Sequence, residues 1–317
     1  MSRHPGEELT HFLGDLYSIE LQALAQLETA PNIAGDAAFA ADLKKHHAET
    51  EVQAERVRNR LEALGGSPSA VKEAIMKLGG KGFLLFAKMQ SETPGRLLVH
   101  SYSYEAMEWA GYQALKHLAQ LNADEETASL ARAIGSEEKV MLDRLGGRFS
   151  TVEEDAHGET PAEDLPDHVR THLAEAHALL KQSATLLDQG TESSRSELAG
   201  TYRRGAELTQ AELKGIERRL EELGSSPSVM EDAAMKLGGL NWSAFFHSQT
   251  DTPMKLLCFA FAVEHLVIGA LELLQRTAQR AEDHVTATLC EHLITEKRQL
   301  AESLRSGIGA SVEATVA

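Results

Sequence analysis

Apolar residues recur at intervals of three and four positions along most of the chain, and no run of alternating Val, Ile and Thr interrupts them. This spacing is typical of amphipathic α-helices, which turn one apolar stripe toward a protein core. In the first half of the chain it predicts four long helices, at about 5–28, at about 36–64, from 93 onward and from 122 onward. The pattern therefore favours an all-α fold.

The residues at the ends of these segments support the same four helices. Gly65 and Gly66 follow the second segment, Pro94 stands at the first helical position of the third, and Asp124 lies in the first turn of the fourth. Short loops make each pair of helices antiparallel, whereas about thirty residues with two short helical pieces separate the second helix from the third. Four long helices with one long middle crossover have the ferritin-like connectivity.

The chain contains this unit twice. Three segments of the first half return in the second half at a constant offset of 159 residues: RLEALGGSPS (60–69) as RLEELGSSPS (219–228), MKLGG (76–80) as MKLGG (235–239), and QSETPGRLL (90–98) as QTDTPMKLL (249–257). An acidic stretch without Lys or Arg lies between the copies. We therefore predict two tandem bundles, over 1–150 and 168–317, joined by a linker over 151–167.

Length and charge narrow the classes of partner. The 317 residues suffice for two ordinary domains, and the net charge of −17 makes the surface repel nucleic-acid phosphates and anionic lipid headgroups. We expect neither partner. No stretch approaches the roughly eighteen uninterrupted apolar residues of a membrane span, and the N-terminus lacks a signal-peptide pattern, which predicts a cytoplasmic protein. With only two cysteines, any metal site must use carboxylate and imidazole ligands.

Ionisable residues interrupt the predicted apolar stripes on all four helices of the first unit. They are Glu20, His46, Glu49, Glu105, Glu108 and Glu138. Burying five carboxylates together is strongly unfavourable unless a cation neutralises them. Five carboxylates and one imidazole form a hard-ligand set, which suits two iron or manganese ions better than zinc or copper. The sequence therefore predicts a dimetal site in the first unit.

The second unit provides an internal comparison for these six positions. Four of them have uncharged counterparts at an offset of about 159 residues: Gly205 for His46, Leu208 for Glu49, Val267 for Glu108 and Leu180 for Glu20. Apolar replacement is expected at buried positions that have lost a ligand role. We assign Glu264 and Glu296 as the acidic counterparts of Glu105 and Glu138. The second unit is thus predicted to be a degenerate bundle without the full ligand set.

Four segments of the first unit carry a family likeness: LYSIELQAL, HHAETEVQAERV with RLEALG, YEAMEWAGYQAL and SEEKVMLDRL. They resemble the four helices of the DUF892 (YciF-like) family of ferritin-like proteins, which are bacterial and stress-associated. The resemblance covers nearly all of the first unit and, more weakly, all of the second. It points to the same six residues as metal positions. Family members with one unit pair as dimers, so it also implies a pseudo-dimer of the two units or a homo-oligomer.

Two functions stay open on the sequence alone. In the first, iron or manganese in the first unit reacts with dioxygen or peroxide, so that the protein oxidises iron or removes an oxidant. In the second, the acidic residues form a hydrogen-bonded network, and the chain is a non-catalytic helical interaction or structural protein of the stress response. Whether the protein is an enzyme stays open too, and the metal content of the purified protein separates the two functions.

Overall fold

The structure is a computed structural model that describes residues 4–68, 93–152, 161–194, 196–225 and 252–317. Every regular element in these ranges is helical, and the ranges contain no strand, which confirms the predicted all-α fold. Most of each predicted crossover, including both MKLGG segments, lies outside the described residues, as do residues 153–160 of the predicted linker.

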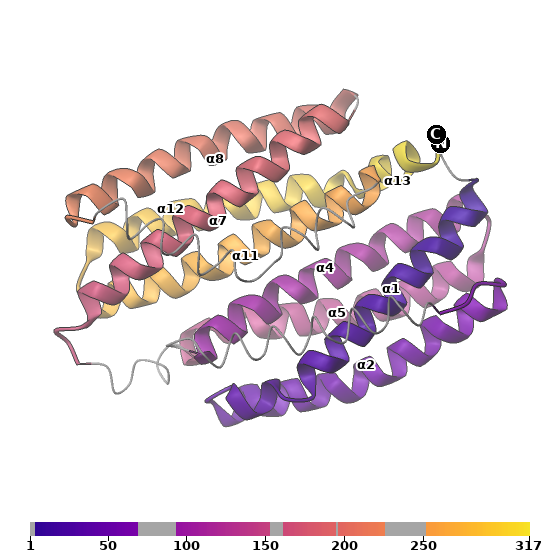
Figure 1. Cartoon of the computed structure of the whole chain (residues 1–317), viewed down its shortest axis with the longest axis horizontal. Coiled ribbons are helices and arrows are strands. Elements are labelled where there is room, and N and C mark those ends of the chain that lie inside the picture. The colour runs from indigo at the N-terminus through magenta and orange to yellow at the C-terminus, as the bar shows by residue number, and fades with distance from the viewer. Residues whose placement is uncertain (1–3, 69–92, 153–160, 195, 226–251) are drawn as a thin grey trace. The chain divides into compact units, whose positions relative to one another are not determined.

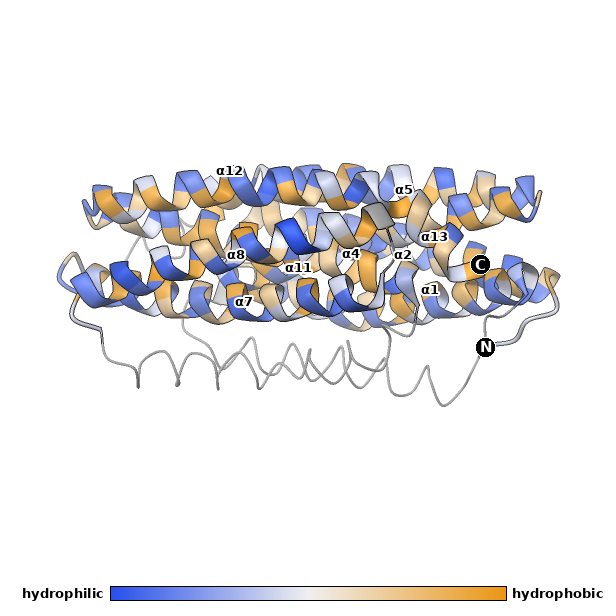
Figure 2. Ribbon diagram, turned by 90° about the horizontal axis from the view of Figure 1, so that it is seen from above, coloured by the Kyte–Doolittle hydropathy of each residue, from blue (hydrophilic) through white to orange (hydrophobic). Residues whose placement is uncertain are grey.

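The chain divides into two compact units, one built mainly from the residues before about 156 and the other mainly from those after it. Within each unit the long helices lie side by side (Figure 1). Figure 2 shows hydrophilic and hydrophobic residues alternating along these helices. In the first unit each long helix contributes an apolar residue that is 0 % exposed: Leu13, Phe39, Leu115 and Ile134. The apolar stripes read from the sequence therefore form the core.

The first unit has four long helices and one short 3₁₀ helix among its described residues. They are α1 (Pro5–Leu27), η1 (Ala30–Ile33), α2 (Ala37–Ala63), α4 (Thr93–Leu121) and α5 (Glu125–Gly146). The carboxylate of Asp36 accepts hydrogen bonds at the start of α2, and Gly65 follows its end with a φ of 78°. The bounds lie close to the predicted ones. The largest difference is at α5, which begins after Asp124 because the side chain of Asp124 accepts the Thr127 backbone N–H.

The second unit repeats these elements. They are α7 (Leu165–Ser193), α8 (Ser196–Glu222), α11 (Pro253–Arg280) and α12 (His284–Ser306). The short helix α13 (Ile308–Val316) follows α12 in the chain. The turns before α5 and α12 repeat as well. Ala123 and Glu282, which are 159 residues apart, both adopt the left-handed conformation, with φ of 54° and 56°. The tandem repeat of the sequence is thus a repeat of local backbone structure.

One described helix, α11, is long and apolar enough to be a candidate membrane span by length and composition, with a mean hydropathy of 1.9 over its best window. Of that window, 94 % is buried inside the fold. The core helix of a folded bundle has the same composition, so α11 is weak evidence for a membrane protein.

Candidate metal centre

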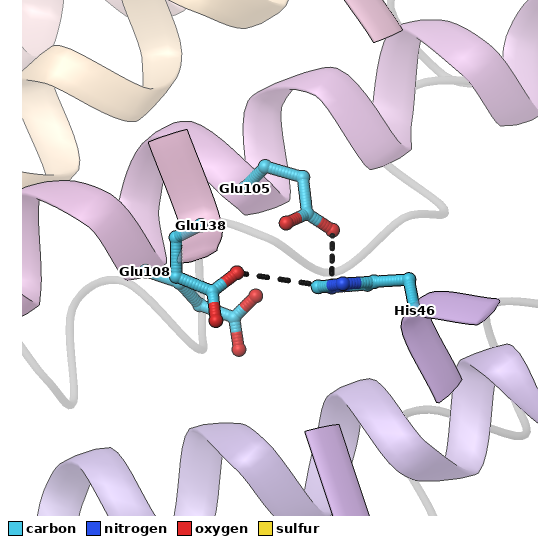
Figure 3. A group of neighbouring side chains, drawn as sticks. All are labelled: His46, Glu105, Glu108 and Glu138. Carbon is cyan, nitrogen blue, oxygen red and sulfur yellow. Dashed lines mark ion pairs between the residues drawn. The ribbon is translucent and has the colours of Figure 1, made fainter. Parts of the chain in front are cut away.

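Four ionisable side chains from three helices meet in the interior of the first unit (Figure 3). His46 comes from α2, Glu105 and Glu108 from α4, and Glu138 from α5. Because Glu105 and Glu108 are three positions apart, they lie on one face of α4. One candidate ligand atom from each of the four residues lies within 4.8 Å of the others. We call these four residues the metal group.

The imidazole of His46 faces two of the carboxylates. Its Nε2 lies 3.1 Å from Oε1 of Glu105 and 3.7 Å from Oε2 of Glu138, the two ion pairs drawn in Figure 3. All four residues of the metal group are buried, with 4 % or less of each exposed. The core therefore contains one imidazole and three carboxylates within reach of a single point.

Most carboxylate oxygens of the metal group have no hydrogen-bond partner among the described residues. This holds for both oxygens of Glu108, both of Glu138 and Oε2 of Glu105. Buried polar atoms without partners are rare, because each loses its hydration without compensation. A divalent cation among these oxygens would supply the compensation, and carboxylate with imidazole is a ligand set that iron and manganese accept. The residues therefore fit a metal ion.

The electrostatics of the metal group point the same way. Burial raises the pKa of Glu108 and of Glu138 well above the usual value, and neighbouring carboxylates raise both further. Burial acts to lower the pKa of His46, but the nearby carboxylates, Glu105 foremost with Glu20 and Glu49, together outweigh burial, so the pKa is raised. A bound cation would reverse the shifts of the carboxyl groups by stabilising their ionised form.

Glu20 of α1 lies in the same interior, next to the metal group. It is 1 % exposed, and the Tyr112 hydroxyl donates a hydrogen bond to its Oε1, while its Oε2 has no hydrogen-bond partner among the described residues. Burial raises its pKa to about 8, although the hydrogen bond from Tyr112 lowers it. The negative charge of Glu105 raises the pKa of Glu20, and that of Glu20 raises the pKa of Glu108.

Glu49 lies at the edge of the interior. Its side chain is 37 % exposed, its Oε1 is 2.8 Å from Nζ of Lys45, and its Oε2 is 3.6 Å from Nδ1 of His46. Burial acts to raise the pKa of Glu49, but Lys45 and His46 together outweigh burial, so the pKa is lowered. The structure thus brings four of the six predicted residues into the metal group and places Glu20 beside it. Glu49 lies on the other side of the His46 ring, near Nδ1, whereas the metal group lies near Nε2.

Two further polar side chains lie in this interior, and the sequence reasoning gave them no ligand role. Tyr112 is 0 % exposed and Gln53 is 1 % exposed. The side-chain amide of Gln53 donates to Oε2 of Glu137 at 3.0 Å, and Arg56 pairs with the same carboxylate at 3.1 Å. Helical spacing was the available signal, because Gln53 stands seven positions after His46 and therefore on the same face.

A family model described as "Domain of unknown function (DUF892)" matches residues 4–155 and 164–317. The chain belongs to the DUF892 family. The two matches confirm the predicted tandem duplication of one family domain. No curated protein and no solved structure matches the chain.

The second DUF892 copy does not reproduce the metal group. Glu264 occupies the position of Glu105 and is 1 % exposed. Gly205 occupies the position of His46, and a Cβ added there would lie 2.8 Å from Cδ1 of Leu300, so the Leu300 side chain would have to move to admit any side chain at this position. Val267, at the position of Glu108, is 0 % exposed.

The assignment of Glu296 as the counterpart of Glu138 is wrong. The unchanged offset of 159 places Lys297 at the position of Glu138, one residue beyond Glu296. The Glu296 side chain is 27 % exposed and lies 3.4 Å from His292, whereas the Lys297 side chain is 0 % exposed. A carboxylate position of the first DUF892 copy has become an ammonium position in the second.

Proposed function

We propose that the first DUF892 copy binds two iron or manganese ions and uses them to react with dioxygen or peroxide. The observation that supports this most directly is the set of buried carboxylate oxygens around His46 that have no hydrogen-bond partner among the described residues. Such an arrangement is unfavourable by itself and favourable around a divalent cation. The proposal extends to a role in the stress response, as the family resemblance implies.

The metal group, His46, Glu105, Glu108 and Glu138, would hold metal, and Glu20 and Glu49 would be the further ligands of a two-ion site. Glu20 offers an oxygen without a hydrogen-bond partner, and Glu49 faces the second nitrogen of His46. When bound, a pair of ferrous ions supplies two electrons, enough to reduce one hydrogen peroxide and two protons to two water molecules.

The chain's own side chains would prepare this site. The carboxyl groups must lose their protons on binding, so metal binding releases protons. The Tyr112 hydroxyl holds the carboxylate of Glu20 in one orientation through its hydrogen bond. Burial of the metal group keeps bulk water away from the ligand atoms.

Metal analysis of the full-length protein tests the proposal. After anaerobic reconstitution with Fe²⁺ or Mn²⁺ and removal of unbound metal, we expect close to two ions per chain, and fewer in a His46→Leu, Glu108→Val variant. Addition of hydrogen peroxide to the Fe²⁺ form should then produce ferric absorbance with consumption of the peroxide.

A non-catalytic helical interaction protein is the second candidate. The hydrogen bond from Tyr112 to Glu20 and the raised pKa values favour it, because protonated acids can form an internal network without metal. A wild-type protein that folds yet binds no metal after reconstitution would contradict the redox function and support this one.

A further inference from the structure

The core of the second copy contains a fully buried lysine. The side chain of Lys297 on α12 is 0 % exposed. An ammonium loses its hydration on burial, which is strongly unfavourable unless other groups replace the water. The core of the second copy must therefore provide a substitute for the hydration shell of Lys297.

Three oxygens surround the buried ammonium. Nζ of Lys297 lies 2.9 Å from Oε2 of Glu212 on α8 and 3.1 Å from Oε2 of Glu264 on α11, and it donates a hydrogen bond of 2.6 Å to the hydroxyl of Thr209. The hydroxyl of Ser183 on α7 donates to the other oxygen of Glu264 at 2.5 Å. We call Lys297, Glu212, Glu264 and Thr209 the lysine site.

The lysine site stands where the first copy has its metal group. Subtracting the offset of 159 converts the two central residues, Lys297 and Glu264, into Glu138 and Glu105. The same offset converts Thr209 and Glu212 of α8 into residues of α2, which also carries His46. Equivalent helices therefore bring equivalent positions together in the two cores. One charge differs in sign, because the ammonium of Lys297 stands where the first copy has the carboxylate of Glu138.

The other ligand positions of the second copy are closed to metal. Gly205 replaces the imidazole with a space that Leu300 fills, and Val267 and Leu180 replace two carboxylates with apolar groups that are 0 % exposed. Two carboxylates and one ammonium are left, whereas the metal group of the first copy has three carboxylates and one imidazole. The positive charge in the second core belongs to the chain itself.

We propose that the ammonium of Lys297 occupies in the second copy the place that a metal ion takes in the first, so that the second copy folds without metal and excludes divalent cations. The comparison with the first copy rests on the proposed metal centre. The role of Lys297 as an internal counter-ion rests on its own contacts with Glu212 and Glu264.

Stability measurements on the full-length protein test the counter-ion role. Lys297→Met keeps an unbranched apolar stem and removes the charge, which leaves two buried carboxylates without a cation. We expect the unfolding midpoint of the second copy to fall by about 10 °C. Lys214→Met removes a charge from an exposed position of the same copy and should shift it by less than about 2 °C. Equal midpoints for the two variants would overturn the counter-ion role.

Manganese binding tests the exclusion of metal. In a full-length chain with His46→Leu and Glu108→Val, which disrupts the metal group, Mn²⁺ added in excess and then desalted should leave no bound ion. Adding Lys297→Glu to that chain should produce about one bound Mn²⁺, because the introduced carboxylate and its two neighbours then lack a counter-ion. An ion bound while Lys297 is intact, or no gain in a folded Lys297→Glu chain, would overturn the proposal.

These outcomes are distinguishable from failure of the proposed function. A wild-type protein without any metal after reconstitution would refute the metal centre of the first copy. The unfolding midpoints of the Lys297→Met and Lys214→Met proteins would still decide whether Lys297 neutralises the second core. The manganese content of the His46→Leu, Glu108→Val chain, in which Lys297 is intact, would still show whether the second copy excludes metal.

Discussion

Burial in the core of the first copy favours the protonated form of three carboxyl groups when no cation is bound. Burial raises the pKa of Glu20 from 4.5 to about 8, and those of Glu108 and Glu138 well above 4.5. Metal ligation requires the ionised form, so protons and metal ions compete for the same oxygens. The protonation of single residues therefore links metal binding to pH.

The first prediction is that the metal-free first copy loses stability as pH rises. A carboxyl group with a raised folded pKa keeps its proton in the folded protein after the unfolded chain has released it, so its stabilising effect is complete below the unfolded value of 4.5 and disappears as pH rises to the folded pKa. The raised pKa of His46 acts in the same direction. Urea unfolding of metal-free protein should give a lower midpoint for the first copy at about pH 8 than at about pH 5.5.

Metal-loaded protein is the control for this prediction, because the bound cation removes the cause of the raised pKa values. Its midpoint should fall less with pH, or rise. A metal-free protein that is more stable at about pH 8 than at about pH 5.5 would show that these carboxyl groups are not desolvated as described.

The second prediction concerns one carboxylate. Glu108→Val copies the residue of the second copy into the first and removes two buried oxygens that have no hydrogen-bond partner among the described residues. We expect the free energy of unfolding of the metal-free protein to rise by about 1–3 kcal/mol, while metal binding is lost. Glu49→Leu makes the matching change at a half-exposed position at the edge of the interior and should alter that free energy by less than about 0.5 kcal/mol. Chemical unfolding of both variants with chelator decides the matter, and a less stable Glu108→Val protein would contradict it.

At the scale of elements, helix periodicity predicted the helices well and the orientation of side chains at the stripe edges less well. Leu43 and His46 lie on one face of α2, and burial of Leu43 carries His46 inward. Glu49 flanks that face, and its pairing with Lys45 on the outer side determines where it points. The spacing of apolar positions does not reveal whether Glu49 pairs with Lys45 on the outer side or turns fully toward the core. Lys297 was missed for another reason, since lysine is rarely buried and a nearby glutamate, Glu296, looked like the better match.

A repeated cap joins two helices in each copy. In the first copy Arg60 of α2 pairs with Asp124 at 2.7 Å, and Asp124 accepts the backbone N–H of Thr127. In the second copy Arg219 of α8 pairs with Asp283 at 2.7 Å in the same arrangement. The cap both ends a turn with left-handed backbone and ties the start of one helix to its neighbour.

The third prediction is that the two caps contribute about equally. Asp124→Ala removes a helix cap and the partner of a mostly buried arginine, and should lower the free energy of unfolding of the first copy by about 2 kcal/mol. Asp283→Ala should lower that of the second copy by a similar amount, and thermal unfolding of both variants measures this. A Lys139→Ala variant, which breaks an exposed pair with Asp143, is the control and should change little. A large loss of stability in the Lys139→Ala control, or no loss in the Asp124→Ala and Asp283→Ala proteins, would contradict the role given to the two caps.

At the scale of the whole molecule, the duplication joins two DUF892 copies in one chain. We propose that the copies pack as an intramolecular pseudo-dimer, as the family resemblance implies. The fourth prediction is that residues 1–150, produced alone, form a homodimer or bind residues 168–317 added separately. Light scattering measures the masses, and a stable monomer of 1–150 with no affinity for 168–317 would contradict the pseudo-dimer.

The last prediction is that metal removal affects one half of the molecule. Metal bound to the folded first copy stabilises it by about 4 kcal/mol when free metal exceeds the dissociation constant about a thousandfold, which for a unit of this size raises its midpoint by about 8–16 °C. Lys297 supplies the second copy with its own cation, so that copy gains nothing from metal. Calorimetry of Mn²⁺-loaded protein with and without chelator should therefore show one transition that moves and one that stays. Glu108→Val should abolish the movement of the first, and Lys297→Met should lower the second with or without metal. If chelation lowers both transitions equally in the wild type, either both copies bind metal or the two copies unfold as one cooperative unit. A Glu108→Val protein separates these cases. Its first copy binds no metal, so chelator can lower its second transition only if the second copy itself binds a metal ion.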